Sequence, residues 1–260
     1  MIHKTSIIDK KAKISRNVTV GPYSIIEADV DINDNTVIGN HVTISRNTRI
    51  GKDCKIFHSA SIGEVPQDLK YNDEKTVAEI GDRTVIREFV TINKGTSASG
   101  KTIVGSDCLL MACVHIAHDC IIKSNVILAN NATLAGHVEI DHNAILGGNS
   151  AIHQFVRIGK YAMIGGMSGV EKDIIPYGLY TGIRENLKSL NLIGLKRKGL
   201  TSNAINEIKN LINIIFDKND TIENNIKNNF VESSEILEIK EVIEFLNSNS
   251  KRGITTFEND

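Results

Sequence analysis

The chain is 260 residues long, 41% of them hydrophobic, and has a formal net charge of −1. This content is ample for a core, and the near-neutral charge gives no electrostatic reason to expect nucleic acid as a partner. No apolar run approaches the roughly 18 residues of a transmembrane helix, and no basic and apolar leader precedes the first repeat. We therefore expect a soluble, cytoplasmic protein with no transmembrane segment. The four cysteines form no CxxC pair, so we expect small core residues in a reducing compartment rather than metal ligands or disulfides.

A spacing of six residues governs the chain from Ile2 to Val170. Of the 29 positions reached in steps of six, 26 are Ile, Leu or Val, and the exceptions are Asp68, Glu74 and Ala98. A helix repeats near 3.6 residues and a strand at 2, whereas a period of six is typical of short strands joined by tight corners in a β-solenoid. Three corners close a coil of 18 residues. The sequence thus predicts a mainly β fold, a parallel β-helix of about nine to ten coils and roughly 45 Å in length.

A second column lies four residues after each aliphatic position, where side chains such as Ala12 and Val18 are small or β-branched. This residue and the next aliphatic are two apart, so both should point inward across one short strand. Several glycines follow their aliphatics directly, which we expect where backbone segments crowd or where φ is positive. They are Gly21, Gly39, Gly51, Gly81, Gly105, Gly147, Gly159 and Gly165.

Two stretches interrupt the repeat. The first, near 64–79, returns to phase at Ile80, and a long excursion from a regular scaffold is more often functional than not. The second, near 95–102, is rich in Gly and Ser and fits a flexible flap and a plain loop equally well. We therefore expect a β-helical domain over residues 1–180 that carries both excursions.

The pattern changes after Val170, and Pro176 and Gly178 mark the exit from the last coil. From about residue 186 the apolar period becomes helical, behind a cap at Thr201 or Ser202. We expect residues 186–260 to form an α-helical domain that covers the open end of the solenoid. The Lys-Arg-Lys run at 196–198 is either a solvated face or an anion site.

Five of the eight histidines fall between residues 115 and 153. Residues 18 apart should stack in successive coils, so His118, Gly136 and Gln154 share one corner. Four of the histidines then gather on this edge, namely His115, His118, His137 and His153. An imidazole can accept a proton from a hydroxyl near neutral pH, and Asp119 beside His118 could hold its tautomer. The backbone N–H of Gly136 would be open to a developing oxyanion.

A metal site is the main alternative for these histidines. A solenoid zinc site of the γ-carbonic-anhydrase kind pairs two histidines five residues apart with a third two coils earlier. His137 and His142 have that spacing, but position 101 is Lys. The sequence therefore favours acid–base chemistry, and we expect no metal.

A second corner line consists of Asn130, Gly148 and Gly166, again at steps of 18 residues. Two readings of this column remain open. Either the geometry of the corner requires glycine, or a column nearly without side chains forms a groove for a long apolar chain.

Several segments carry a closer resemblance. They are 61–71 (SIGEVPQDLKY), 115–120 (HIAHDC), 128–137 (LANNATLAGH), 153–155 (HQF) and 194–197 (GLKR). These segments resemble the acyl-carrier-protein–UDP-N-acetylglucosamine O-acyltransferases, which are left-handed parallel β-helix proteins of the hexapeptide-repeat family. The resemblance implies a homotrimer with active sites between subunits. It also implies transfer of a (3R)-hydroxyacyl group from acyl carrier protein to the glucosamine 3-hydroxyl of UDP-GlcNAc, the first step of lipid A biosynthesis. No metal or soluble cofactor is implied, since the phosphopantetheine of the carrier protein delivers the acyl group.

The same resemblance assigns roles to residues. His118 is implied to be the general base, oriented by Asp119, with the Gly136 N–H at the oxyanion. The residues implied to contact the sugar nucleotide or its phosphates are Gln67, Asp68, Lys70, His115, His137, His153 and Gln154. Asn191 and Arg197 are implied to reach the nucleotide end, and Asn130 and Gly166 to line the acyl groove. The chain departs from the family pattern after the last coil, where the family often has Gly-Asn and this chain has Gly182-Ile183, followed by Arg184. It also departs at Lys198, which replaces a common second Arg.

Three alternatives stay open. The later N-acyltransferase of the same pathway shares the repeat and the donor, but it has an extra N-terminal domain, whereas here the repeat begins at Ile2. A non-catalytic solenoid would bind UDP-GlcNAc and give no acyl product, and a metal-dependent hydratase would hold zinc. The sequence decides neither the acyl length nor the choice between a 3-hydroxyl and a 3-amino sugar acceptor.

Overall fold

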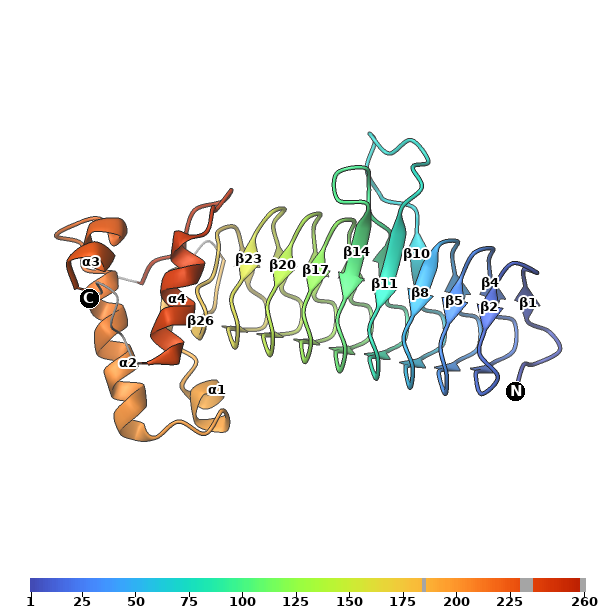
Figure 1. Ribbon diagram of the computed structural model, residues 1–260, viewed down its shortest axis with the longest axis horizontal. Coiled ribbons are helices and arrows are strands. Elements are labelled where there is room, and N and C mark those ends of the chain that lie inside the picture. The colour runs from blue at the N-terminus through green and yellow to red at the C-terminus, as the bar shows by residue number, and fades with distance from the viewer. Residues whose placement is uncertain (184–185, 230–235, 258–260) are drawn as a thin grey trace.

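The computed structural model describes residues 1–183, 186–229 and 236–257 of the chain. These residues form a long parallel β-solenoid with a helical region at its C-terminal end (Figure 1). In the described chain, three sheets make the three sides of the solenoid, and each strand pairs with the strand one coil away. The predicted mainly β fold with helices after the solenoid is confirmed.

The strands are short and fall into the three sheets in turn. Sheet 1 contains β1 (Ile7–Ile8), β4 (Ile25–Ile26), β7 (Thr43–Ile44), β10 (Ser61–Glu64), β13 (Thr91–Asn93), β16 (His115–Ile116), β19 (Thr133–Leu134), β22 (Ala151–Ile152) and β25 (Gly169–Val170). Sheet 2 contains β2 (Lys13–Ile14), β5 (Asp31–Ile32), β8 (Thr48–Ile50), β11 (Val77–Ile80), β14 (Lys101–Val104), β17 (Ile121–Ile122), β20 (Glu139–Ile140) and β23 (Arg157–Ile158). Sheet 3 contains β3 (Thr19–Val20), β6 (Val37–Ile38), β9 (Lys55–Ile56), β12 (Val85–Ile86), β15 (Leu109–Leu110), β18 (Ile127–Leu128), β21 (Ile145–Leu146), β24 (Met163–Ile164), β26 (Gly178–Tyr180) and the antiparallel β27 (Leu187–Leu190).

The core is the interior of the triangular coil. The aliphatic residue of each strand points inward, and Ile26, Ile44 and Ile116 are at most 1% exposed. The second inward column is equally buried, as at Val42. Successive coils pair in register, for example Ile26 with Ile44 and Ile116 with Leu134. A slip by one residue would turn every aliphatic outward, so the hydrophobic pattern sets this register.

Backbone crowding and positive φ, the two reasons expected for glycine at the corners, occur at different corner positions. Positive φ occurs at the third residue after the aliphatic, usually a non-glycine such as Asn35, Asn47 or Asn131. Asn adopts this left-handed conformation more readily than most residues. The eight glycines named above that directly follow an aliphatic do not have positive φ, although Gly63 after Ile62 does; a Cβ atom on Gly21 would lie 2.6 Å from the carbonyl carbon of Gly39. Crowding between coils is therefore the reason for these glycines.

The two excursions, residues 65–76 and 94–100, leave the solenoid at the same edge, between sheets 1 and 2. They project side by side from that edge (Figure 1). Their bases are joined, because Oγ1 of Thr76 donates to the carbonyl oxygen of Gly95 at 2.6 Å and Nδ2 of Asn93 donates to that of Val65 at 3.0 Å.

The helical region consists of α1 (Leu192–Arg197), α2 (Ser202–Ile215), α3 (Ile222–Asn229) and α4 (Leu237–Asn247). Thr201 caps α2, since its Oγ1 accepts the N–H of Ala204 at 3.3 Å. The segment after α4 returns to the last coil, where the N–H of Thr255 donates to the carbonyl oxygen of Asp173 at 2.8 Å. This pairing covers strand groups at the end of the solenoid. None of the helices in the described ranges has the length and hydrophobicity needed to cross a membrane.

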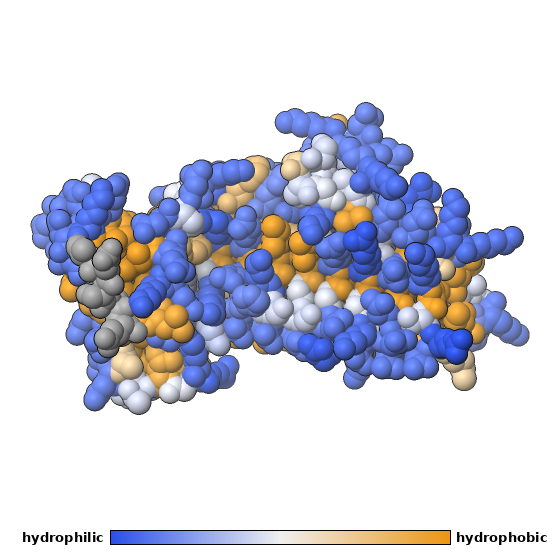
Figure 2. Space-filling view, viewed as in Figure 1, coloured by the Kyte–Doolittle hydropathy of each residue, from blue (hydrophilic) through white to orange (hydrophobic). Residues whose placement is uncertain are grey.

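The three outer surfaces of the solenoid differ in charge. In the described strands of sheet 2, six of the eight residues that precede the inward aliphatic are charged: Lys13, Asp31, Arg49, Glu79, Glu139 and Arg157. The same positions of sheet 1 are Ile7, Ile25, Thr43, Ser61, Thr91, His115, Thr133, Ala151 and Gly169. In sheet 3 they are apolar from Val85 through Leu109, Ile127 and Ile145 to Met163. Figure 2 looks onto sheet 2 and shows mostly hydrophilic residues, with hydrophobic ones between them.

Candidate active site

His118 and Asp119 occupy the corner that follows β16. We call the edge between sheets 1 and 2 the histidine edge; it includes corners 117–119, 135–137 and 153–155. Both residues are buried, and 9% of the His118 side chain and 0% of the Asp119 side chain are exposed. Oδ2 of Asp119 lies 2.8 Å from Nδ1 of His118. An ionised carboxylate accepts the Nδ1 proton, which leaves Nε2 as the basic atom of the imidazole.

The second excursion holds the carboxylate of Asp119. Thr96 donates its Oγ1 hydrogen to Oδ2 at 2.7 Å and its backbone N–H to Oδ1 at 3.0 Å. The Ser99 hydroxyl also donates to Oδ1. Burial raises the pKa of Asp119, but the hydrogen bonds from Ser99, Thr96 and His118 outweigh it and lower this pKa to about 2. Asp119 is therefore ionised at neutral pH, and hydrogen bonds from Thr96 and Ser99 connect the second excursion to its carboxylate.

Gly136 lies against the ring of His118. A Cβ atom at this position would be 2.6 Å from Cε1 and 2.8 Å from Nε2 of His118. The predicted stacking of the two corners is confirmed, because the N–H of His137 donates to the carbonyl oxygen of His118 at 3.0 Å. The N–H of Gly136 has no acceptor among the described residues. At the equivalent corner position of an earlier coil, two residues after the inward aliphatic, the N–H of Arg46 donates to Oε2 of Glu27 at 3.0 Å. The donor of Gly136 is thus open to a ligand.

His137 extends the site by one coil. Its ring meets that of His118 edge-on, with 5.2 Å between centroids, and stacks on Phe155 at 4.5 Å. Lys251, from the segment after α4, has its Nζ atom 4.7 Å from the Phe155 centroid. Burial lowers the pKa of His137, and this effect outweighs the nearby charge of Asp119. A cavity of about 460 Å³ borders this group, with Ser99 and Phe155 in its lining.

The other residues predicted on the histidine edge lie beside the pair. His115 faces outward on β16, with its Nδ1 atom 2.7 Å from Oγ1 of Thr91, and burial lowers its pKa. His153 and Gln154 are exposed in the next corner, where Nδ1 of His153 is 3.3 Å from the carbonyl oxygen of Gln154. The arrangement presents side chains on both sides of His118.

Gln67, Asp68 and Lys70 lie on the first excursion. Asp68 stabilises a turn, since its Oδ1 accepts the N–H of Lys70 at 3.0 Å. Gln67 and Lys70 are exposed, and Asp68 is partly buried. Among the effects on the pKa of His137, burial lowers it most, and the charge of Asp68 is one of the smaller ones that raise it. The first excursion leaves the solenoid at this same edge, between β10 and β11.

Asn130, Gly148 and Gly166 stack on a different edge, between sheets 3 and 1. We call it the glycine edge; it includes corners 129–131, 147–149 and 165–167. Neither glycine has positive φ. A Cβ atom would approach its nearest neighbour at 3.3 Å on Gly148 and 3.2 Å on Gly166, whereas on Gly147 it would approach at 2.4 Å. A Cβ atom at Gly148 or Gly166 would be close to backbone but less crowded than at Gly147, and Asn130 carries a side chain at the same corner position. This favours the groove over the geometric explanation.

Asn191 lies at the third edge, between sheets 2 and 3. We call it the tyrosine edge; it includes corners 123–125, 141–143 and 159–161. Nδ2 of Asn191 donates to the carbonyl oxygen of Tyr161 at 2.8 Å, and its Oδ1 caps α1 by accepting the N–H of Gly194 at 3.0 Å. Arg197 is exposed in the last turn of α1. Within a single chain, Asn191 at the tyrosine edge therefore lies on a different edge from His118 at the histidine edge.

The two departures from the family pattern differ in what the structure describes. Ile183 is 68% exposed and forms a bridge to Gly169. Arg184 lies outside the described residues. Lys198 is engaged within its own chain, where Nζ donates to Oε1 of Glu238 at 2.6 Å and to the Tyr177 hydroxyl at 3.0 Å.

The atoms that the metal alternative needs are only partly brought together. His118, Asp119 and His137 offer potential ligand atoms within 4.8 Å of one another. Both oxygens of Asp119, however, already accept hydrogen bonds, and His118 is one of the donors. His142 lies at the tyrosine edge, where its Nδ1 accepts the N–H of Ser124 at 3.2 Å. These contacts favour a hydrogen-bonded acid–base pair over a zinc site.

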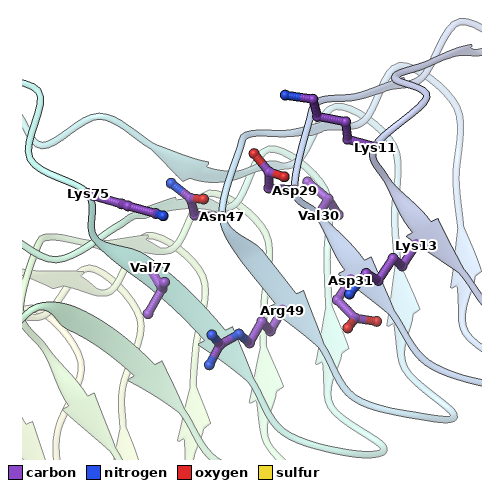
Figure 3. Close-up of a pocket in the computed structure, with 9 residues that line it drawn as sticks. All are labelled: Lys11, Lys13, Asp29, Val30, Asp31, Asn47, Arg49, Lys75 and Val77. Carbon is purple, nitrogen blue, oxygen red and sulfur yellow. The ribbon is translucent and has the colours of Figure 1, made fainter.

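A second hollow, of about 420 Å³, lies on sheet 2 near the N-terminal coils (Figure 3). Four basic side chains line it, Lys11, Lys13, Arg49 and Lys75, together with two acidic ones, Asp29 and Asp31. Because the two carboxylates lie among the cations, the hollow is not a uniformly basic anion site.

Comparison with known proteins identifies the family. Residues 173–255 match the family model described as UDP N-acetylglucosamine O-acyltransferase, domain 2, and residues 11–46 and 101–136 match the bacterial transferase hexapeptide. The acyl-[acyl-carrier-protein]–UDP-N-acetylglucosamine O-acyltransferase of Aliarcobacter butzleri is 43% identical over 254 residues, which are 97% of each chain. The chain belongs to this family.

Other members of the family agree in sequence and structure. The protein of the same name from Herminiimonas arsenicoxydans is 50% identical over 224 residues, or 86% of each chain. The structure of the UDP-N-acetylglucosamine acyltransferase of Francisella novicida has a TM-score of 0.94 at 36% identity and covers 100% of this chain and 95% of that one. The enzyme of Moraxella catarrhalis has the same score at 40% identity, with 98% and 99% covered. These matches confirm an acyltransferase with a left-handed parallel β-helix.

Sequence reasoning missed the residues that hold Asp119. Thr96 and Ser99 lie in the second excursion, where no repeat places them. The only available signal was the concentration of hydroxyl groups in a loop that leaves from the histidine edge.

Proposed function

We propose that this chain transfers a (3R)-hydroxyacyl group from acyl carrier protein to the glucosamine 3-hydroxyl of UDP-GlcNAc, the first step of lipid A biosynthesis, with His118 as general base. One observation carries the assignment of the base. Asp119 holds Nδ1 of His118 at 2.8 Å, while the other side of the ring lies against Gly136. The basic nitrogen and an open backbone donor thus lie together on a chain of this acyltransferase family.

The geometry suits acyl transfer from a thioester. Nε2 of His118 takes the proton of the 3-hydroxyl as that oxygen attacks the thioester carbonyl. The oxyanion of the tetrahedral intermediate accepts the open N–H of Gly136. When the C–S bond breaks, the imidazolium returns its proton to the departing phosphopantetheine thiolate, which leaves as a thiol. Asp119 stays ionised and stabilises the imidazolium between these steps.

Residues around the pair would hold the substrates. Gln67, Asp68 and Lys70 on the first excursion, and His115, His137, His153 and Gln154 on the edge, have the family positions of sugar-nucleotide contacts. Asn130 and Gly166 would line the acyl groove, and Asn191 and Arg197 would meet the nucleotide.

We propose a homotrimer because the predicted contacts lie on three different edges of one chain. Sheets 1 and 3 have mostly uncharged outer surfaces, whereas sheet 2 is charged. If sheet 1 of one subunit packs on sheet 3 of the next, sheet 2 remains in solvent and the glycine edge turns to the three-fold axis. His118 of one subunit then faces the tyrosine edge of its neighbour, which holds Asn191. An acyl chain would run inward between the two sheets.

The proposal includes no metal or soluble cofactor, because each chemical step uses a group of this chain or of the carrier protein. It also places the protein in the cytoplasm. Cys54, Cys108 and Cys120 are buried free thiols, as is usual in a reducing compartment.

The direct test is an assay of purified His118→Ala with acyl carrier proteins of several chain lengths and with both 3-hydroxyl and 3-amino acceptors. Mass spectrometry of the products identifies chain and linkage. We expect the wild-type enzyme to give an ester product. In the His118→Ala variant we expect turnover to fall by at least about 100-fold. Near-normal turnover would remove His118 as the base, and an amide product would overturn the acceptor. Binding of UDP-GlcNAc with no acyl product would indicate a non-catalytic solenoid, and loss of activity with a chelator would indicate a metal enzyme.

A further inference from the structure

The hydroxyl groups of the second excursion surround the partner of the proposed base. The Asp119 side chain is 0% exposed, so its carboxylate depends on protein donors rather than on bulk solvent. Its oxygens accept two hydrogen bonds from Thr96 and one from Ser99, besides that from His118. The N–H of Asp119 also donates to Oγ1 of Thr102 at 2.8 Å. Thr102 lies in β14, the strand of sheet 2 that follows the second excursion. The carboxylate is thereby fixed from the loop side as well as from the imidazole side.

These donors decide what the carboxylate can do. A hydroxyl that donates to a carboxylate favours its ionised form, and burial alone would favour the neutral form. A neutral Asp119 could donate a proton to Nδ1, which would place the imidazole proton on Nε2 and block the base. An ionised Asp119 requires a proton on Nδ1 and leaves Nε2 free. The loop therefore acts on the base through the carboxylate, without touching the reacting atoms.

The loop is also held in place. Thr76 at the end of the first excursion donates to the carbonyl oxygen of Gly95 at 2.6 Å, one residue before Thr96. The N–H of Ala98 donates to Oγ1 of Thr96 at 3.2 Å, which turns the loop back toward the solenoid and brings Ser99 to Asp119. Ser97 is exposed and is not among the donors to Asp119 in the part of the chain that the structure describes.

We propose that Thr96 and Ser99 are positioning residues of the reaction, which fix the tautomer of His118 by holding Asp119. The inference rests on the proposed role of His118 as base. It assigns Thr96 and Ser99 of the second excursion a role in setting the protonation of the pair, and leaves Ser97 of the same loop without one.

The test uses the full-length enzyme with Thr96→Val, Ser99→Ala and the double variant, and with Ser97→Ala as a matched control in the same loop. We expect kcat of the double variant to fall by about 10- to 100-fold, a range typical of groups that orient a reactive residue, while KM for UDP-GlcNAc stays within about two-fold. The acidic limb of the pH profile of kcat/KM should move up by roughly 0.5 to 1 unit, because a carboxylate with fewer donors makes the pair hold a proton more strongly. An enzyme with Thr96→Ser, which keeps the hydroxyl, should have the kcat and the pH profile of the wild type. Ser97→Ala should change neither kcat nor the pH profile.

A second measurement separates positioning from folding. Imidazole ¹⁵N resonances of His118 should show Nδ1 protonated in the wild type at neutral pH and a mixture of tautomers in the double variant. An unchanged kcat and pH profile in the double variant, with His118→Ala inactive, overturns this inference and leaves the base in place. A lower Tm with an unchanged pH profile and no rescue by Thr96→Ser shows a structural role only and also overturns it. Full activity of His118→Ala would overturn the proposed function and this inference together.

Discussion

The imidazole of His118 lies directly on the backbone of Gly136 in the next coil, so close that a Cβ atom there would be 2.6 Å from Cε1. His118 cannot move away freely, because Asp119 holds Nδ1 and the ring of His137 meets it edge-on. The contact means that position 136 has no room for a side chain while His118 keeps its place.

The first prediction follows from this contact. In Gly136→Ala, the new methyl group must push the imidazole off its position or block the open N–H, so kcat should fall by at least about 100-fold, as on removal of an oxyanion donor. The measurement is steady-state kinetics together with thermal unfolding. Gly148→Ala serves as the control for Tm, because its Cβ atom would meet its nearest neighbour at 3.3 Å. A Gly136→Ala enzyme with wild-type kcat would contradict the placement of the oxyanion.

The second prediction concerns pH. The pKa of Asp119 is about 2 in the folded chain, below the value of about 3.9 usual for an unfolded Asp. A lowered carboxyl pKa stabilises the fold above the unfolded value, and that stabilisation is lost as pH falls through about 4 to 2. A pKa lowered by nearly two units corresponds to a stabilisation of about 2 to 3 kcal/mol at neutral pH. Asp119→Asn lacks it, so the difference in free energy of unfolding between the wild type and this variant should shrink over that range. Urea unfolding at several pH values checks this, and a constant difference would contradict it.

The third prediction tests the groove on the glycine edge. A Cβ atom on Gly166 would lie 3.2 Å from the carbonyl oxygen of Gly148, so a larger side chain must point out of the corner into the proposed groove. Gly166→Leu should therefore shift the product to acyl chains that are shorter by a few carbons, because the leucine side chain would fill part of the groove. Tm should change little. Mass spectrometry of products from a panel of acyl carrier proteins measures this. Met167→Leu, in the adjacent exposed position, should keep the wild-type chain length.

The fourth prediction compares two outward isoleucines. Ile127 lies on the apolar surface of sheet 3 and Ile103 on sheet 2, and each is partly buried between strands of its own sheet. Ile127→Glu would bury a charge in the proposed subunit contact and should give a monomer of about one third of the wild-type mass. Ile103→Glu should remain a trimer. Light scattering during gel filtration distinguishes the two, and a trimeric Ile127→Glu would place the contact elsewhere.

The fifth prediction tests whether a site is shared between subunits. His118→Ala and Asn191→Ala should each lose activity alone. In random mixed trimers, about a quarter of the sites would combine an intact His118 from one subunit with an intact Asn191 from the next. Co-expression should thus restore about a quarter of the wild-type activity. A mixture as inactive as its parents would show that each chain supplies both residues to its own site.

The repeat predicted part of the site because spacing and position are linked in a solenoid. His118 and Gly136 are 18 residues apart, and the buried aliphatics on either side of them fix the register of their coils. The same arithmetic stacked Asn130, Gly148 and Gly166. It could not reach Thr96, since the excursion has no inward column to fix where each residue points.

By itself, the sequence determined the solenoid, its sheets and the residues that share an edge, because each inward aliphatic leaves only one register that buries the whole column. Only the tertiary structure decided which loop closes over which edge. It placed Ser99 on Asp119, bonded the two excursions at their bases, and put Asn191 on an edge away from His118. These contacts join segments outside the repeat, and their geometry depends on side-chain hydrogen bonds and on packing that no period encodes.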